Sequence, residues 1–163
     1  MAKKIAKTNA ARILDKEKVP YEILQYEPGD GLVDGVSVAA KIGYSDKTVH
    51  KTLVAVGHSK QHYVFVIPVS EELDLKKAAK AAGEKKIDMV PVKDILALTG
   101  YIRGGCSPIG MKKPFPTFIS EKARDLEIII VSAGKIGMQL KLSPEELLKA
   151  TNGQLADLAV GDE

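Results

Sequence analysis

The stretch TVHKTLVAVGHSKQHYVFVIPV, residues 48–69, gives the strongest structural signal in the sequence. Two runs of β-branched and apolar residues flank the polar segment HSKQ. Such runs favour strands, and a short polar connection between them is typical of a hairpin. We therefore predict two antiparallel strands, residues 48–57 and 62–69.

Helical and extended segments follow one another irregularly on both sides of this hairpin. Capping residues, glycine stops and apolar spacing predict helices at 8–18, 36–43, 74–83, 91–100 and 143–151, with a short one after Ser120. Short apolar runs predict strands at 21–26, 86–90, 116–120, 127–134 and 137–142. Because the pattern contains a hairpin and no regular strand–helix alternation, it favours an α+β fold over a doubly wound parallel sheet.

The chain has 163 residues, a formal charge of +3 and one cysteine. This length suits a single domain, 1–163, and no linker or repeat divides it. One cysteine excludes an internal disulfide and suits a reducing compartment. No apolar run reaches the roughly 20 residues of a membrane span, and no signal peptide follows the first lysines. We therefore expect a cytoplasmic protein that does not enter a membrane.

Common catalytic and cofactor motifs are missing from the sequence. It has no C-x-x-C, H-E-x-x-H, G-x-S-x-G or P-loop pattern, so we predict no metal and no cofactor. The glycine-rich segment GYIRGGCSPIG, residues 100–110, holds the cysteine, Cys106. A nucleophilic cysteine needs a nearby base or cation, and the three histidines lie far from it in the sequence.

Lys51 is unusual because it stands inside the apolar strand 48–57. An unpaired buried ammonium is costly, so this side chain must reach the rim of the sheet, pair with an anion or face a polar cavity. In a cavity it would serve as a point charge for a phosphate or a developing oxyanion. The alternation of the strand leaves these alternatives open.

Four segments together resemble the YbaK/EbsC group of aminoacyl-tRNA deacylases, which is related to the inserted editing domain of bacterial prolyl-tRNA synthetases. They are HKTLVAV (50–56), LDLKKAAKAAG (73–83), TGYIRGGCSPIGMKK (99–113) and VSAGKIGMQL (131–140). The resemblance extends from residue 7 to residue 158, nearly the whole chain. It implies a curved, barrel-like mixed β-sheet flanked by helices, with a pocket between the sheet and the glycine-rich segment.

The resemblance also implies site residues by position. The expected catalytic residues are Lys51, Gly104 and Gly105, and the expected substrate-binding residues are Tyr26, Thr52, Ser107, Ser132 and Gly134. In the family's loop pattern G-G-x-S-P-x-G, Cys106 occupies the variable position, so we expect it to be a bystander. Gln139 stands where close relatives often carry an acidic residue, and we assign it no role.

The activity that the resemblance implies is removal of cysteine from mischarged cysteinyl-tRNA(Pro), with the substrate's own thiol attacking the ester carbonyl. Possible tRNA backbone contacts are Lys76, Lys77, Lys80, Lys112 and Lys113, and prolyl-tRNA synthetase is the expected partner. Two alternatives stay open. The chain could edit alanyl-tRNA(Pro) with a bound water, or it could bind aminoacyl-tRNA or a synthetase without catalysis.

Overall fold

A computed structural model of the chain describes residues 8–27, 29, 34–102 and 104–160. The helices are α1 (Asn9–Lys16), α2 (Gly35–Ile42), α3 (Leu75–Ala82), α4 (Val92–Thr99), α5 (Pro144–Thr151) and the short 3₁₀ helix η1 (Glu121–Asp125). The strands are β1 (Glu22–Gln25), β2 (His50–Gly57), β3 (His62–Pro68), β4 (Ile87–Met89), β5 (Thr117–Ser120), β6 (Ile129–Ser132), β7 (Met138–Leu142) and β8 (Gln154–Ala156). Every helix and strand that the sequence predicts is present. β8 was not predicted, because three residues give no periodic signal.

Side-chain and glycine caps set the helix ends where the sequence places them. Before α1, the Thr8 hydroxyl accepts a hydrogen bond from the N–H of Ala11 at 3.3 Å. The Asp74 carboxylate accepts from two backbone amides in the first turn of α3. Gly43 and Gly83 end α2 and α3 with φ of 76° and 72°, in the left-handed region. These caps satisfy backbone groups that the first and last turns leave without helical partners.

The described strands form two sheets, in the orders β1-β7-β6 and β4-β2-β3-β5-β8. The hairpin prediction is confirmed, because β2 and β3 pair antiparallel with His50 opposite Pro68. β3, β5 and β8 run parallel, so the larger sheet is mixed. The two sheets meet at an isolated bridge between Val49 and Ile130. The α+β class is therefore confirmed, whereas the described strands do not close into the barrel-like sheet that the resemblance implies.

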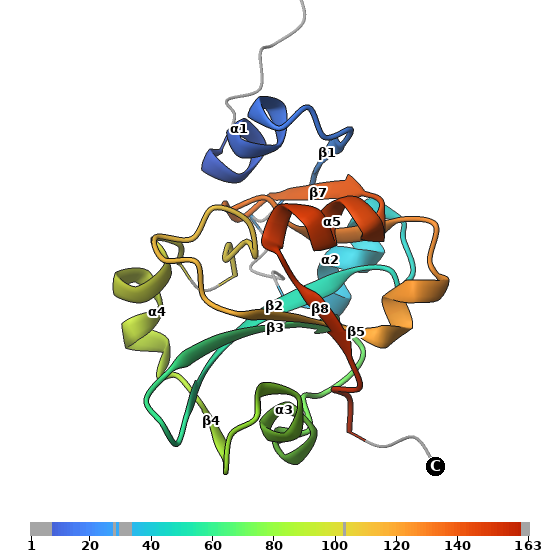
Figure 1. Cartoon of the computed structure of the whole chain (residues 1–163). Coiled ribbons are helices and arrows are strands. Elements are labelled where there is room, and N and C mark those ends of the chain that lie inside the picture. The colour runs from blue at the N-terminus through green and yellow to red at the C-terminus, as the bar shows by residue number, and fades with distance from the viewer. Residues whose placement is uncertain (1–7, 28, 30–33, 103, 161–163) are drawn as a thin grey trace, which may run out of the picture.

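Alternation along β3 divides the core into two layers, one on each face of the larger sheet. Phe65 and Ile67 pack with Ala78 of α3 on one face. Val64 and Val66 pack on the other face, against α1, α5 and the smaller sheet. Figure 1 shows this arrangement, with α3 below the larger sheet and α5 and β7 above it. None of the described helices has the length and apolar composition that crossing a bilayer would need.

The outer edge of β2 changes partners along its length, and this change creates an opening. β4 pairs only with residues 55–57 of β2. At the other end of the strand, the N–H of Ile130 in β6 donates to the carbonyl of Thr48 at 3.1 Å. Between these two attachments no described strand pairs with residues 50–53 on this edge. A stretch of strand edge is therefore left facing a gap between the two sheets.

Candidate active site

A pocket of about 770 Å³ lies at this gap. Its walls come from the end of β1, the start of α2, the open edge of β2, the glycine-rich segment, and the neighbouring strands β6 and β7. The lining residues are Tyr26, Asp34, Gly35, Val36, Val38, Val49, His50, Lys51, Thr52, Leu53, Val69, Gly104, Cys106, Ser132 and Gln139. Five consecutive residues, 49–53, take part because the strand borders the pocket with its edge as well as with its faces. Of the eight predicted site residues, five line this pocket: Tyr26, Lys51, Thr52, Gly104 and Ser132.

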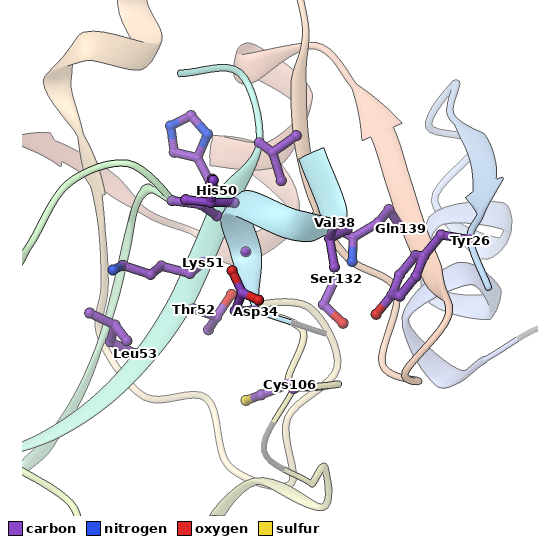
Figure 2. A pocket seen from close by; sticks show the side chains of 15 residues that line it. Tyr26, Asp34, Val38, His50, Lys51, Thr52, Leu53, Cys106, Ser132 and Gln139 are labelled. Carbon is purple, nitrogen blue, oxygen red and sulfur yellow. The ribbon is translucent and has the colours of Figure 1, made fainter. Parts of the chain in front are cut away.

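Two hydroxyl groups in this pocket lack hydrogen-bond partners. The hydroxyls of Tyr26 and Thr52 are both buried, and neither forms a hydrogen bond with the described residues. Figure 2 shows them on opposite sides of the gap, each turned toward it. A buried hydroxyl without a partner costs free energy, because it has given up its hydrogen bonds to water. Two such groups at one opening indicate a site that a polar ligand completes.

Ser132 and Asp34 extend this polar surface. The Ser132 hydroxyl accepts a hydrogen bond from the N–H of Gly134 at 3.2 Å and points into the gap beside Tyr26 (Figure 2). The Asp34 carboxylate caps α2 by accepting from the backbone N–H of Ser37 at 3.1 Å and from its hydroxyl at 2.7 Å. These bonds, chiefly the one from the hydroxyl, lower the pKa of Asp34. The carboxylate is therefore ionised at neutral pH.

Lys51 lies on the other side of β2 from Thr52. Its side chain is partly buried, and among the described residues it forms no ion pair. In Figure 2 the ammonium extends away from Tyr26 and Ser132. The pocket therefore has a positive group on one flank of the strand and oxygen-rich walls on the other.

The paired glycines Gly104 and Gly105 have different surroundings. Gly104 has φ of 86°, lines the pocket and makes no hydrogen bond through its N–H to another described residue. Gly105 is buried, and its N–H donates to the carbonyl of Ile102 at 3.0 Å. A Cβ atom on Gly105 would lie 3.0 Å from the backbone nitrogen of Ile136, so this glycine allows two chain segments to pack closely. Of the two glycines, Gly104 is the one that lines the pocket and whose N–H has no partner among the described residues.

Ser107 and Gly134 are near the pocket but are not among the residues that line it. The Ser107 side chain is fully buried and accepts from the N–H of Ile109 at 3.2 Å. Gly134 has φ of 100°, and a Cβ atom there would lie 2.6 Å from the ring of Tyr101. Both residues hold the walls in place. The N–H of Gly134 orients Ser132 directly.

Cys106 lines the pocket but has the wrong protonation state for a nucleophile. Burial raises the pKa of its thiol to about 11, although a hydrogen bond with Thr99 opposes this effect. The thiolate is the reactive form, so at neutral pH this cysteine is protonated and inert. The structure therefore supports the interpretation of Cys106 as a bystander.

The predicted tRNA-contacting lysines lie outside the pocket lining. Lys77 is already engaged, because its ammonium contacts the Asp157 carboxylate at 3.2 Å and donates to the carbonyl of Ala159 at 2.8 Å. Lys112 reaches the carbonyl of Ala97 near the end of α4 at 3.4 Å. The remaining three, Lys76, Lys80 and Lys113, are exposed. Among the described residues, no group of acidic, cysteine or histidine side chains is arranged to hold a metal ion.

His50 is buried and points away from the gap between Thr52 and Tyr26 (Figure 2). Its Nδ1 lies 2.8 Å from the carbonyl of Thr48, so Nδ1 carries the proton and Nε2 is left without a partner. Burial lowers the pKa of this imidazole to about 4, although the hydrogen bond to Thr48 acts in the opposite direction. The native state therefore keeps His50 neutral well below pH 6.

This burial predicts a loss of stability in acid. Between pH 6.5 and 4 the unfolded chain binds a proton at His50 and the native state does not, so the free energy of unfolding falls as the pH falls. The loss from pH 7.5 to pH 4.5 should be about 2–3 kcal/mol larger for the wild type than for His50→Gln. Urea unfolding at both pH values measures it, with exposed His58→Gln as the control. Equal losses in wild type and His50→Gln would contradict the prediction.

Asp34 and Gln139 are two polar residues of the pocket that were not assigned a role from the sequence. Asp34 belongs to the loop-like stretch EPGDGLVDG, where its spacing from Ser37 is the available signal, because Asp before a helix is a common N-cap. Gln139 was set aside because it departs from the family pattern, yet it is buried and lines the pocket. It lies opposite Ser132 in the β6–β7 ladder, which explains why it reaches the same opening.

Comparison with known proteins places this geometry in a family. Residues 33–150 match the aminoacyl-tRNA editing domain. The chain is 51% identical over 160 residues to the Enterococcus faecalis protein EbsC, provisionally described as a Cys-tRNA(Pro)/Cys-tRNA(Cys) deacylase, and the match covers 97% of this chain and 98% of that protein.

Two solved structures share the fold at low sequence identity. One is provisionally described as a trans-editing enzyme for prolyl-tRNA synthetase; it has a TM-score of 0.82 and 24% identity, covering 96% of this chain and 100% of that one. The other is a hypothetical protein with a TM-score of 0.85 and 21% identity, covering 94% and 100%. The domain match and the near full-length relative together show that this chain belongs to the aminoacyl-tRNA editing domain family.

Proposed function

We propose that this protein is a deacylase that removes cysteine from mischarged cysteinyl-tRNA(Pro). The observation that carries the proposal is the pocket at the open edge of β2. It combines one lysine, one glycine amide without a partner and two buried hydroxyls without partners. The likeness to a relative described as a deacylase for cysteinyl-tRNA supports the substrate.

Among the described residues that line the pocket, none is an activated nucleophile, and we therefore assign the attacking atom to the substrate. Cys106 is protonated, and the imidazole of His50 points elsewhere. The attacking atom is then the sulfur of the bound cysteine. A bond forms between this sulfur and the ester carbonyl carbon, the bond from that carbon to the ribose oxygen breaks, and the thiol proton passes to the ribose oxygen. The products are a cyclic thiolactone and free tRNA.

The protein's part in this mechanism is to hold a reactive conformer and to stabilise charge. Alignment of the reacting atoms can supply roughly 7–11 kcal/mol of the barrier. In this proposal the N–H of Gly104 donates to the carbonyl oxygen, and a donor of this kind is typically worth about 2.7–4 kcal/mol. Lys51 holds either the terminal phosphate or the developing oxyanion. Gly105 supports this site through packing.

The rest of the tRNA is held by weaker contacts in this proposal. Lys76, Lys80, Lys112 and Lys113 are candidates for contacts with tRNA phosphates, and such contacts make affinity depend on salt without reading sequence. Lys77 would first have to release Asp157. A small protein that contacts only the acceptor end of the tRNA needs a partner protein to select tRNA(Pro). We therefore assign prolyl-tRNA synthetase as its partner, in the cytoplasm.

A deacylation assay tests this function. Purified protein is mixed with cysteinyl-tRNA(Pro), alanyl-tRNA(Pro) and correctly charged prolyl-tRNA(Pro), and the loss of each ester is followed. We expect cysteine to be released at least ~1000-fold faster than alanine, because alanine has no internal nucleophile to exploit the aligned site. Prolyl-tRNA(Pro) should remain intact. Faster release of alanine would favour a hydrolase for alanyl-tRNA(Pro), and binding without release of any amino acid would favour a non-catalytic module.

A further inference from the structure

The main chain of Thr52 has no role in the mechanism above. Thr52 lies on the open edge of β2 and lines the pocket (Figure 2). Its side-chain hydroxyl is buried and forms no hydrogen bond with the described residues. The direction of its backbone N–H and C=O groups follows from the hydrogen bonds that neighbouring residues of the strand form.

The backbone groups of successive strand residues point to opposite edges of the strand. On the open edge, the carbonyls of Thr48 and Val54 accept hydrogen bonds from backbone N–H groups, one in β6 and one directly after β4, at 3.1 Å each. On the edge that pairs with β3, the carbonyl of Val49 accepts from the N–H of Val69 at 2.9 Å. Thr52 stands two residues before Val54 and four after Thr48. Its N–H and its C=O therefore both face the open edge.

These two groups of Thr52 have no partner among the described residues. β4 pairs with residues 55–57, and the bridge to β6 is at Val49. In the ladder with β3, Thr52 lies opposite Val66 but directs neither its N–H nor its C=O toward that strand. A donor and an acceptor of one residue thus stand side by side at the border of the pocket. Main-chain groups that are shielded from water need partners, so this pair indicates a ligand.

The length of the opening excludes another β-strand as this ligand. Residues 50–53 span roughly 13 Å, and β4 and β6 attach to the strand at either end of this stretch. A flat group with one acceptor next to one donor fits such a short edge, because it needs only the two groups of Thr52. The pocket volume of about 770 Å³ leaves room for such a group in addition to a cysteinyl group.

We infer that the backbone N–H and C=O of Thr52 bind the terminal adenine of the tRNA. This inference rests on the proposed function for its substrate, because the amino acid of an aminoacyl-tRNA is attached to the ribose of a terminal adenosine. Adenine has an amino group beside a ring nitrogen, N1 or N7, at each of two edges. The ring nitrogen accepts from the N–H of Thr52, and the amino group donates to its C=O.

This contact recognises the end of the tRNA without regard to the amino acid. A base that carries a carbonyl in place of the amino group, such as hypoxanthine, would place that oxygen against the C=O of Thr52. The protein should therefore discriminate against an aminoacyl ester on inosine, although the ribose, the ester and the amino acid are the same.

Binding of unreactive probes tests the inference without relying on turnover. In each probe an amide joins a cysteinyl group to the ribose of adenosine, inosine or purine riboside, which has hydrogen in place of the amino group. By calorimetry, the wild type should bind the adenosine probe at least about tenfold more tightly than the inosine probe, because two acceptors would face each other in the inosine complex. The purine riboside probe should bind with intermediate affinity.

Two further probes identify the edge of adenine that is bound. 1-Deazaadenosine and 7-deazaadenosine each have carbon in place of one ring nitrogen, N1 or N7. One of these probes should bind at least about threefold more weakly than the adenosine probe, and the other should bind like it, because a single N–H donates to one ring nitrogen. Wild-type affinity for both would show that the N–H of Thr52 is not used, and the inference would be wrong.

Position 52 offers a matched pair of protein variants. Thr52→Val removes the hydroxyl and keeps both main-chain groups, so the preference for adenosine over inosine should stay within about twofold of the wild-type value. Incorporation of the α-hydroxy acid analogue of valine at the same position replaces the N–H with an ester oxygen. This protein should bind the adenosine probe at least about fivefold more weakly than Thr52→Val and should no longer distinguish the two deaza probes. Melting temperatures check that both proteins are folded.

A parallel deacylation assay separates this inference from the proposed function. If the wild type binds the adenosine and inosine probes equally, or binds neither, and still cleaves cysteinyl-tRNA(Pro), the inference falls and the proposed function stands. Loss of the preference in Thr52→Val would assign it to the hydroxyl and would also overturn the inference. A preference for adenosine without cleavage of cysteinyl-tRNA(Pro) would support the adenine contact and remove the proposed function.

Discussion

Lys51→Ala should lower the rate of deacylation of cysteinyl-tRNA(Pro) by at least about 100-fold, because a single preorganised donor to developing charge is worth roughly 2.7–4 kcal/mol. Lys51 forms no ion pair among the described residues, so its removal leaves no buried charge without a partner. The melting temperature should therefore change by only a few degrees. Loss of activity with the fold intact would assign the effect to the charge.

The measurement is single-turnover deacylation with enzyme in excess, which separates the chemical step from product release. Lys51→Arg should also be strongly impaired, since a planar guanidinium does not replace a compact ammonium at a site shaped for a point charge. Cys106→Ser is the matched control: it changes another lining residue, and its activity should stay within about twofold of wild type because the protonated thiol does no chemistry. A Lys51→Ala enzyme that keeps wild-type rates would refute the assignment of Lys51.

The elements of this fold could be predicted from the sequence because each carries a local signal. β2 and β3 are marked by β-branched runs, and α2 and α3 end at Gly43 and Gly83, whose left-handed conformation glycine adopts most easily. The arrangement of the strands could not be predicted. Pairing of β3 with β5 joins segments about fifty residues apart, and nothing local in either strand specifies that partner.

The candidate site, like the fold, could be predicted from the sequence only in part. The resemblance identified Lys51, Thr52 and Tyr26, which all line the pocket. It did not separate Gly104 from Gly105, because the direction of an amide depends on backbone angles that two identical residues do not reveal. Asp34 was missed because its cap signature explains it locally, and its place in the pocket lining follows from the packing of α2 beside the open edge of β2.

Replacing the thiol of the substrate should have the largest effect of all. 2-Aminobutyryl-tRNA(Pro) has a methyl group where cysteine has its sulfhydryl, so it keeps nearly the same shape and the same amino group. Alignment of an internal nucleophile is worth roughly 7–11 kcal/mol, so we expect this ester to be cleaved at least ~1000-fold more slowly than cysteinyl-tRNA(Pro). Single-turnover rates with the wild-type protein measure the ratio.

Binding must be kept separate from chemistry for this comparison to be decisive. The amide analogues of the two esters should bind with similar affinity, because their side chains differ only by a methyl group in place of the sulfhydryl and have nearly the same shape. The cysteinyl ester should give thiolactone as its first product, detectable by mass spectrometry before it opens in water. If the 2-aminobutyryl ester were cleaved at a rate close to that of the cysteinyl ester, the attacking atom would have to be a water oxygen. The protein would then need to position that water, and the unpartnered hydroxyls of Tyr26 and Thr52 would be the first groups to examine.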